Sequence, residues 1–250
     1  MADKSHDMQC VAVYAHGGGY ARGEARMYIR YMERWVRVAA EAGIHLTFVS
    51  VEYPLSDKNP HPAQLDAFIS AYRHLLNEGI SSENIVFMGD SAGGGLCVLS
   101  GFECMSLGLP QPAGSILLSL WIDMSLRCHQ GGNALVETDY VVTANKVCPI
   151  YAAQFLGGLP GDSKQINPLY REPSEITGLN PLLILTGAAE FAVQDSKDLA
   201  MLASKAGVEN KLICEQGQLH IYALGSTWLD PRIRERTDKT IVDWMKRCID

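Results

Sequence analysis

The strongest constraint on the fold of this chain is the pentapeptide Gly-Asp-Ser-Ala-Gly at residues 89–93, which directly follows the apolar run Ile-Val-Phe-Met. The β-branched and aromatic residues of that run favour a buried strand, and the small residues after it favour a closely packed helix. Glycines two positions before and after Ser91 allow the backbone to crowd at a tight strand-to-helix turn. We therefore expect a buried strand and a helix that meet at Ser91.

The rest of the chain alternates short apolar runs with longer stretches of helical period, a pattern typical of parallel strands joined by crossover helices. Six strands are predicted, at residues 11–15, 46–53, 85–89, 114–120, 182–186 and 211–215. One helix is predicted from Pro62 to a cap at Gly79, and the last helix from Pro231, with Asp230 as its cap. The expected fold class is α/β, with a mostly parallel sheet of about six strands and helices on both faces.

The chain is expected to form one domain, because 250 residues with 47% hydrophobic side chains can bury one substantial core. Only residues 126–167 depart from the alternation of strands and helices, and we interpret them as a cap-like insertion over the functional site. Apolar side chains in that segment form either a pocket wall or part of the core: Tyr140, Val141, Val142, Ile150, Tyr151 and Phe155.

Bulk properties exclude several classes of function. The net charge is −7, and we find no run of Lys or Arg of the kind that nucleic acids or anionic membranes require. No apolar stretch reaches the roughly 18 residues of a membrane span, and the polar start is unlike a secretory signal. Seven cysteines without a C-x-x-C pair indicate neither a disulfide framework nor a zinc site. We expect a cytoplasmic protein that acts on a neutral small molecule without a metal or organic cofactor.

A glycine run follows the first predicted strand, at His16 to Gly19. Its backbone can turn N–H groups toward a developing oxyanion, together with the N–H of Ala92. A phosphate-binding loop would instead need a following Lys-Ser or Lys-Thr, which the sequence lacks. We therefore interpret the run as a site for a transient anion beside Ser91.

Ser91 can act as a nucleophile only if a base removes its proton. Among the seven histidines, His220 follows the last predicted strand, so its side chain can reach Ser91 across the carboxyl edge of the sheet. The chain order serine, acid, histidine is also the order expected of this kind of fold. We therefore predict that His220 is the base.

The acid that orients the histidine should follow the strand at 182–186. Glu190 lies in the loop after that strand, whereas Asp195 immediately precedes a helical stretch whose first turn it is expected to cap. This structural role for Asp195 favours Glu190 as the acid, and Asp195 remains the alternative.

Together these motifs resemble the hormone-sensitive-lipase branch of the α/β-hydrolases, also called the GDXG esterases. The similarity includes HGGG at 16–19 and GDSAGG at 89–94, and it extends to VEYPLSDKNPHPA at 51–63 and NPLY at 167–170. The resemblance implies a catalytic triad of Ser91, Glu190 and His220. It also implies oxyanion donors at Gly17, Gly18 and Ala92.

Three departures from the family pattern affect what can be carried over. Only fifteen residues precede HGGG, where the family usually has several dozen, so we expect a reduced N-terminal cap and an exposed edge at the strand ending near Tyr53. A second copy of the chain can pair with such an edge to form a homodimer. The acid is Glu rather than the usual Asp, and Pro54 stands where the family has Arg.

The resulting hypothesis is a serine carboxylic-ester hydrolase that forms an acyl-enzyme on a small or medium apolar ester. An amidase, a deacetylase, or a cyclase or lyase using the same residues is the alternative, because fold analogy does not fix the reaction. A ligand-binding receptor is disfavoured, because the receptors that resemble this family have lost the histidine that His220 provides here.

Overall fold

The computed structural model describes residues 8–127, 135, 139 and 144–250. Within them the strands are β1 (Met8–Ala15), β2 (Ile44–Ser50), β3 (Ile85–Asp90), β4 (Gly114–Leu118), β5 (Leu182–Gly187) and β6 (Asn210–Glu215). The main helices are α1 (Ile29–Glu41), α2 (Ala63–Asn77), α3 (Ala92–Leu107), α5 (Ala144–Leu156), α6 (Val193–Lys205) and α7 (Pro231–Ile249).

The six strands form one sheet in the order β2-β1-β3-β4-β5-β6, and every neighbouring pair is parallel. This arrangement confirms the predicted fold class. β2 lies at one edge, as expected, although it ends at Ser50 rather than at Tyr53. Beyond this end of β2, the Tyr53 ring stacks on His16, with the ring centroids 4.2 Å apart.

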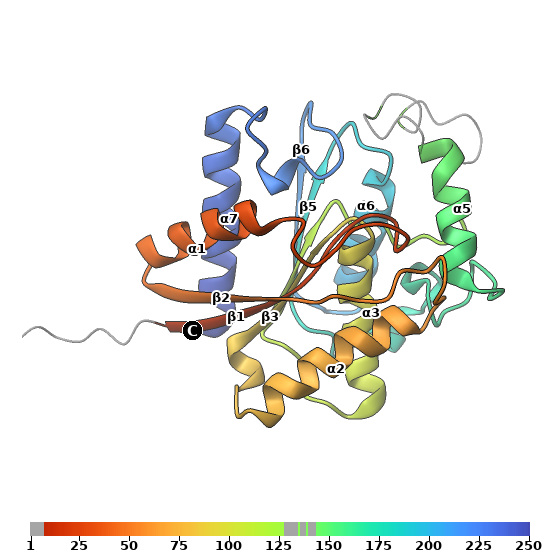
Figure 1. The fold of residues 1–250 in the computed structure, drawn as a ribbon, viewed down its shortest axis with the longest axis horizontal. Coiled ribbons are helices and arrows are strands. Elements are labelled where there is room, and N and C mark those ends of the chain that lie inside the picture. Colours follow the sequence, from red (N-terminus) through yellow and green to blue (C-terminus); the bar gives the residue numbers. More distant parts are fainter. Residues whose placement is uncertain (1–7, 128–134, 136–138, 140–143) are drawn as a thin grey trace, which may run out of the picture.

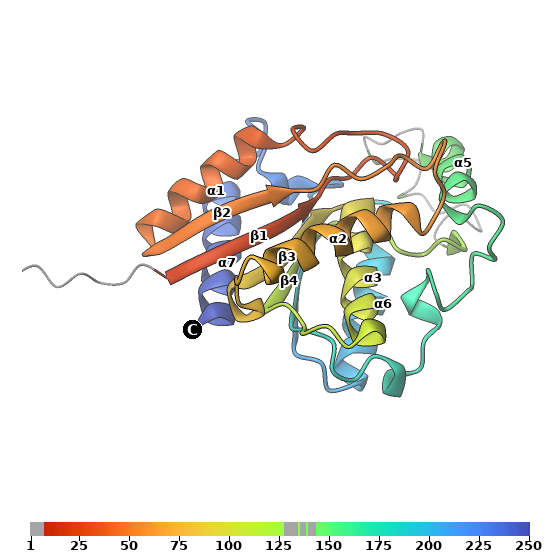
Figure 2. The ribbon, with the colours of Figure 1, turned by 60° about the horizontal axis from the view of Figure 1, so that its bottom comes forward.

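Helices lie on both faces of the sheet (Figure 1), and a separate hydrophobic core is buried on each face. α1 and α7 pack on one face, where Trp35 and Met245 are buried against β1 side chains such as Tyr14. α2, α3 and α6 cover the other face, and Figure 2 shows them on the opposite side of the sheet from α1. Because both faces are covered, the central strands read as continuous apolar runs in the sequence.

The helix boundaries predicted from capping residues agree with the structure. The backbone at Gly79 is left-handed, with φ of 84°, directly after the C-cap of α2, where a side chain would be strained. α2 buries Phe68 and Tyr72, whose rings both contact Phe87 of β3 edge-on at 4.9 Å. At the start of α7, the Asp230 carboxylate accepts a hydrogen bond from the Arg232 N–H at 2.8 Å.

Helix α5 is the largest described part of the 126–167 segment, and both views show it on the opposite side of the molecule from α1 and α7 (Figures 1 and 2). Phe155 belongs to the core, because it is fully buried and stacks on Tyr20 at 3.8 Å between ring centroids. Ile150 is 55% exposed, so it does not belong to the core. The other predicted residues, apart from Tyr151, lie outside the described residues: Tyr140, Val141 and Val142.

No helix in the described part of the chain has the length and apolar character needed to cross a bilayer. Six cysteines are described, and all six are free thiols.

Candidate active site

The residues selected from the sequence gather at the carboxyl ends of neighbouring strands. The glycine turn follows β1, Ser91 follows β3, Glu190 follows β5 and His220 follows β6. Parallel strands end at the same edge of a sheet, so residues far apart in the sequence meet there. The strand order places the glycine turn on one side of Ser91, and Glu190 and His220 on the other.

Ser91 lies in a strained turn between β3 and α3, with φ of 51° and ψ of −123°. Its N–H donates to the Leu118 carbonyl at 2.9 Å, which holds the turn against β4. A Cβ at Gly89 or Gly93 would collide with backbone, because both glycines lie against the Ala15 carbonyl of β1. The glycines at 89 and 93 therefore serve the close approach that the sequence pattern predicts.

The hydroxyl of Ser91 and the imidazole of His220 are in direct contact. Ser91 Oγ lies 2.9 Å from His220 Nε2, within hydrogen-bonding distance. Both side chains are largely buried, with exposed fractions of 9% and 6%. The two residues are separated by 129 positions in the sequence, and the sheet edge brings them together.

Glu190 is fully buried beside this pair, and its carboxylate is held by three donors. Its Oε2 accepts hydrogen bonds from Ser119 Oγ at 2.6 Å and from the Gly187 N–H at 3.0 Å, and its Oε1 accepts one from Thr186 Oγ1 at 2.7 Å. Oε2 lies 3.8 Å from His220 Nδ1, which is an ion-pair distance and too long for a hydrogen bond. Such contacts are often long in the absence of substrate.

The charge state of His220 depends on its neighbours. Burial disfavours the imidazolium, but the nearby carboxylates of Glu190, Asp139 and Asp90 outweigh burial and raise the pKa of His220 above its usual value. A raised pKa makes the imidazole a stronger base toward the Ser91 hydroxyl.

Ser119 is a residue of the site that sequence reasoning missed. It follows β4, is fully buried and has a φ of 51°, an uncommon backbone conformation for a serine. Its hydroxyl donates to Glu190 and accepts the Ile221 N–H at 2.9 Å. Ser119 therefore ties the loop of the acid to the loop of the histidine.

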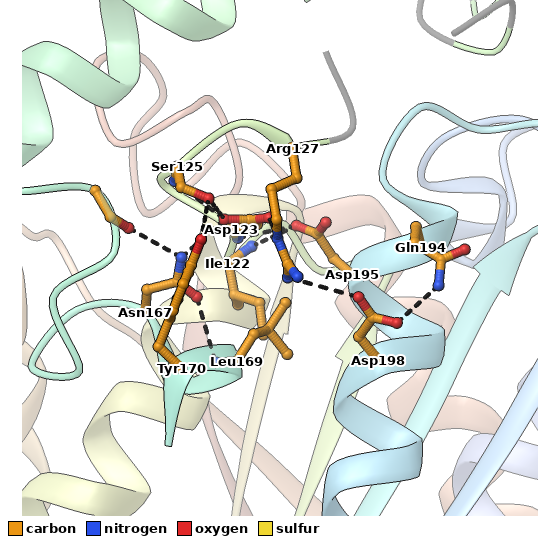
Figure 3. Close-up of polar contacts among 11 residues, drawn as sticks. Ile122, Asp123, Ser125, Arg127, Asn167, Leu169, Tyr170, Gln194, Asp195 and Asp198 are labelled. Carbon is orange, nitrogen blue, oxygen red and sulfur yellow. Dashed lines mark hydrogen bonds and ion pairs between the residues drawn. The ribbon is translucent and has the colours of Figure 1, made fainter. Parts of the chain in front are cut away.

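Asp195 does not cap a helix, contrary to expectation. It lies inside the first turn of α6, and its Oδ2 accepts the N–H groups of Ile122 and Asp123, each at 3.0 Å (Figure 3). Burial and the neighbouring Asp123 charge raise the pKa of Asp195 to about 7. Asp195 therefore holds the loop after β4 that leads into the 126–167 segment. No described contact joins Asp195 to His220, so the geometry favours Glu190 as the acid.

Asp123 is a second buried carboxylate in this cluster (Figure 3), and its charge is satisfied. It accepts hydrogen bonds from Arg127 Nε at 2.7 Å and from Asn167 Nδ2 at 2.8 Å. Burial disfavours its charge, but these hydrogen bonds and that from Ser125 outweigh burial and lower the pKa of Asp123. The cluster therefore joins the two ends of the 126–167 segment, and none of its described hydrogen bonds involves Glu190.

The glycine turn differs from the prediction at Gly17. The Gly17 N–H donates to Asp90 Oδ1 at 2.9 Å, so it lacks the free donor that an oxyanion site requires. No hydrogen bond within the described part of the chain uses the N–H groups of Gly18 or Gly19, and both glycines line the cavity that contains Ser91. The Ala92 N–H begins α3 and so has no partner within the helix.

Asp90 holds this turn in place. Besides the Gly17 N–H, it accepts hydrogen bonds from Tyr14 at 2.8 Å and Tyr28 at 3.0 Å. Burial raises the pKa of Asp90, and the three hydrogen bonds partly offset that effect. Asp90 therefore links β1, the segment before α1 and the nucleophile turn.

A cavity of about 210 Å³ lies over Ser91 and His220. Its walls include Trp121, Phe191 and, from α5, Val147 and Tyr151. Tyr151 is thus the residue of the 126–167 segment for which the predicted role as a pocket wall agrees with the structure. A larger groove of about 940 Å³ between α2, α3 and the segment after α5 contains none of the candidate catalytic residues. No group of three or more His, Cys, Asp or Glu within the described residues is arranged to hold a metal ion.

Comparison with known proteins identifies the family. A family model described as alpha/beta hydrolase fold matches residues 12–224. This chain belongs to that family. Among curated proteins, an acetyl-hydrolase of Streptomyces hygroscopicus is 29% identical over 195 residues, which are 78% of this chain and 62% of the relative. An esterase of Acinetobacter venetianus is 26% identical over 220 residues, which are 86% of this chain and 68% of the relative.

A solved structure also resembles this chain in detail. The crystal structure of a hormone-sensitive lipase from a metagenome library superposes with a TM-score of 0.84 at 28% identity and covers 96% of this chain and 78% of that chain. The resemblance to the hormone-sensitive-lipase branch of the α/β-hydrolases is therefore confirmed. The relatives support an enzyme of the esterase or lipase type, and this chain spans 62% and 68% of the length of the two curated relatives.

Proposed function

We propose that this chain is a serine carboxylic-ester hydrolase that forms an acyl-enzyme on small or medium apolar esters. The observation that carries the proposal is the 2.9 Å contact between Ser91 Oγ and His220 Nε2 inside a cavity lined by unused backbone N–H groups. A hydroxyl, a base and oxyanion donors in one cavity are the requirements of acyl transfer. The cavity of about 210 Å³, walled by Trp121, Val147 and Phe191, suits a short apolar acyl group.

In the proposed mechanism, Ser91 Oγ attacks the ester carbonyl while His220 Nε2 takes the hydroxyl proton. The N–H groups of Gly18, Gly19 and Ala92 stabilise the negative charge on the carbonyl oxygen. His220 then gives its proton to the departing alcohol, and an acyl-enzyme on Ser91 remains. Water, deprotonated by His220, releases the acid and regenerates Ser91, while Glu190 stabilises the imidazolium in both steps.

The test is covalent labelling combined with turnover. A fluorophosphonate probe should form an adduct on the peptide that contains Ser91, and the adduct should be absent in Ser91→Ala. The same variant should lose about 10⁴-fold to 10⁶-fold in kcat, as other serine triads do. Nitrophenyl esters of increasing chain length should give the highest kcat/KM at short acyl chains. If wild-type protein binds esters without labelling at Ser91, a cyclase or lyase reaction replaces the proposal.

The predicted homodimer is proposed to form through an exposed sheet edge, since both β2 and β6 leave one side unpaired within the described sheet. Sedimentation velocity of wild type and of a variant with Thr47→Pro, at an exposed position of β2, tests this proposal. Loss of a dimer in the variant supports the β2 edge, and a wild-type monomer contradicts the homodimer.

A further inference from the structure

One cationic side chain at the catalytic cavity, Arg22, has no anionic partner among the described residues. Arg22 is exposed and lines the same cavity as Ser91 and His220. No ion pair or side-chain hydrogen bond to Arg22 occurs among the described residues. Its guanidinium contacts the ring of Tyr151, with 5.7 Å between Cζ and the ring centroid. An arginine that only adds charge to the surface could lie anywhere on the molecule, whereas Arg22 lies at the cavity that contains Ser91 and His220.

The backbone of Arg22 is fixed by the turn that holds the candidate oxyanion donors. The Gly18 carbonyl accepts the N–H groups of Ala21 at 3.2 Å and of Arg22 at 3.0 Å. Gly19 lies so close to the Tyr151 ring that a Cβ there would overlap it. Tyr151 therefore contacts both the oxyanion turn and the guanidinium, so the turn and Arg22 lie on the same part of the cavity wall.

The other charges around the cavity are negative, so the positive charge of Arg22 stands out among them. Carboxylates of Glu190, Asp139 and Asp90 act on His220, and the whole chain carries a net charge of −7. An anionic substrate would be repelled unless a local cation offsets these charges. Among the described residues that line this cavity, Arg22 alone is an arginine or a lysine. Its planar fork of N–H donors suits a carboxylate, which it can bind through two hydrogen bonds.

We propose that Arg22 is a specificity residue that binds a carboxylate carried by the ester substrate. The preferred substrates are then half-esters of dicarboxylic acids, or esters whose alcohol part carries a carboxylate. This inference rests on the proposed esterase function and revises its substrate class from apolar esters to esters that have an apolar reacting part and a carboxylate at the other end. The carboxylate remains at the rim, where Arg22 is exposed, and the apolar cavity takes the reacting part of the molecule.

The test compares matched charged and neutral esters. One pair differs in the acyl part, 4-nitrophenyl hydrogen glutarate against 4-nitrophenyl valerate, with the spontaneous hydrolysis of each subtracted. The other differs in the alcohol part, 4-acetoxybenzoate against methyl 4-acetoxybenzoate. Wild type should favour the charged member of one pair by about fivefold to tenfold in kcat/KM, the range between an exposed ion pair and a bidentate one. The preference should weaken as salt is added.

Arg22→Met should lower the ratio of kcat/KM for the charged ester to kcat/KM for the neutral ester to about one, and Arg22→Lys should keep part of the preference. Arg26→Met is the matched control, because Arg26 is also exposed but lines a different groove, along α1 with Ile29 and Glu33. It removes the same charge and should leave the ratio unchanged. Equal ratios in wild type and Arg22→Met for both pairs would overturn the inference. Absence of hydrolysis of all four esters would instead count against the proposed function.

Discussion

Replacing Glu190 with Gln tests the site most directly, because the change removes one charge and almost no volume. A glutamine can keep its oxygen toward Ser119 and Gly187 and turn its NH₂ group toward the Thr186 hydroxyl, which can accept a hydrogen bond. The variant should therefore fold. Glu190 Oε2 and His220 Nδ1 are 3.8 Å apart, and two unit charges at that distance attract by about 4 kcal/mol at an effective dielectric constant of about 20.

In the proposed mechanism, that attraction stabilises the imidazolium that forms when His220 takes the Ser91 proton. Its loss should lower kcat by about 10³-fold, since each 1.36 kcal/mol in the barrier is about tenfold in rate. The pH profile should shift as well. Glu190 contributes to the raised pKa of His220, and only the neutral imidazole acts as a base, so activity is lost as pH falls through that pKa. Without Glu190 the pKa of His220 falls, and the acidic limb of kcat/KM moves to lower pH.

The assay is hydrolysis of 4-nitrophenyl acetate between pH 4 and pH 9, with circular dichroism as the test of folding. Asp195→Asn is the matched control, because an amide oxygen can still accept the N–H groups of Ile122 and Asp123. It should keep wild-type activity. The reasoning is refuted if Glu190→Gln stays within about threefold of wild type with an unchanged acidic limb, or if folded Asp195→Asn is the inactive variant.

Three further predictions concern the surrounding structure. Ser119→Ala leaves the Ile221 N–H without a partner and removes one of the two donors to Glu190 Oε2, so kcat should fall about tenfold to a hundredfold in the same assay. Ser100→Ala removes a buried hydroxyl that has no described partner and should not change kcat. Asp238→Ala unpairs Arg34 and the Trp35 indole N–H, and should lower the free energy of unfolding in urea by about 2–4 kcal/mol. The exposed Asp243→Ala, which removes only an ion pair with Lys239, should cost under about 1 kcal/mol. Burial raises the pKa of Asp195 from its ordinary value of 3.8 to about 7 in the folded protein, so the folded state binds its proton more tightly and stability falls as pH rises from about 4 to 7. Asp195→Asn removes this loss. The free energy of unfolding of the variant minus that of wild type should therefore be larger at pH 8 than at pH 5. An equal difference at both pH values contradicts the raised pKa of Asp195.

The fold could be predicted largely because its signals are local. Strands covered on both faces produce continuous apolar runs such as 85–88, and capping residues such as Asp230 and Gly79 indicate helix ends from a few neighbouring positions. The order of motifs along the chain also indicates which loops meet at the sheet edge. Ser91 and His220 were identified on that basis.

Residues that act through tertiary contacts were not predictable in the same way. Nothing in the sequence around Ser119 indicates that its hydroxyl bridges Glu190 and Ile221, because both partners lie on other strands' loops. Gly17 was misjudged because the sequence does not show that Asp90 takes its N–H. Asp195 resembled a helix cap by position, whereas its partners belong to the loop after β4. A carboxylate or an amide close to a motif in the sequence can form hydrogen bonds with other segments, and such a residue indicates that the expected role can be replaced by another contact.

The turn at Ser91 is built by main chain pressed against main chain, at Gly89, Gly93 and Ala15. Side chains that surround the substrate, such as Arg22 and Val147, come from separate segments and contribute nothing to that contact. The conformation of the nucleophile turn and the shape of the cavity therefore depend on different segments of the chain. Directed evolution that randomises the cavity-lining side chains can therefore explore new substrates, while each library member keeps the same turn at Ser91.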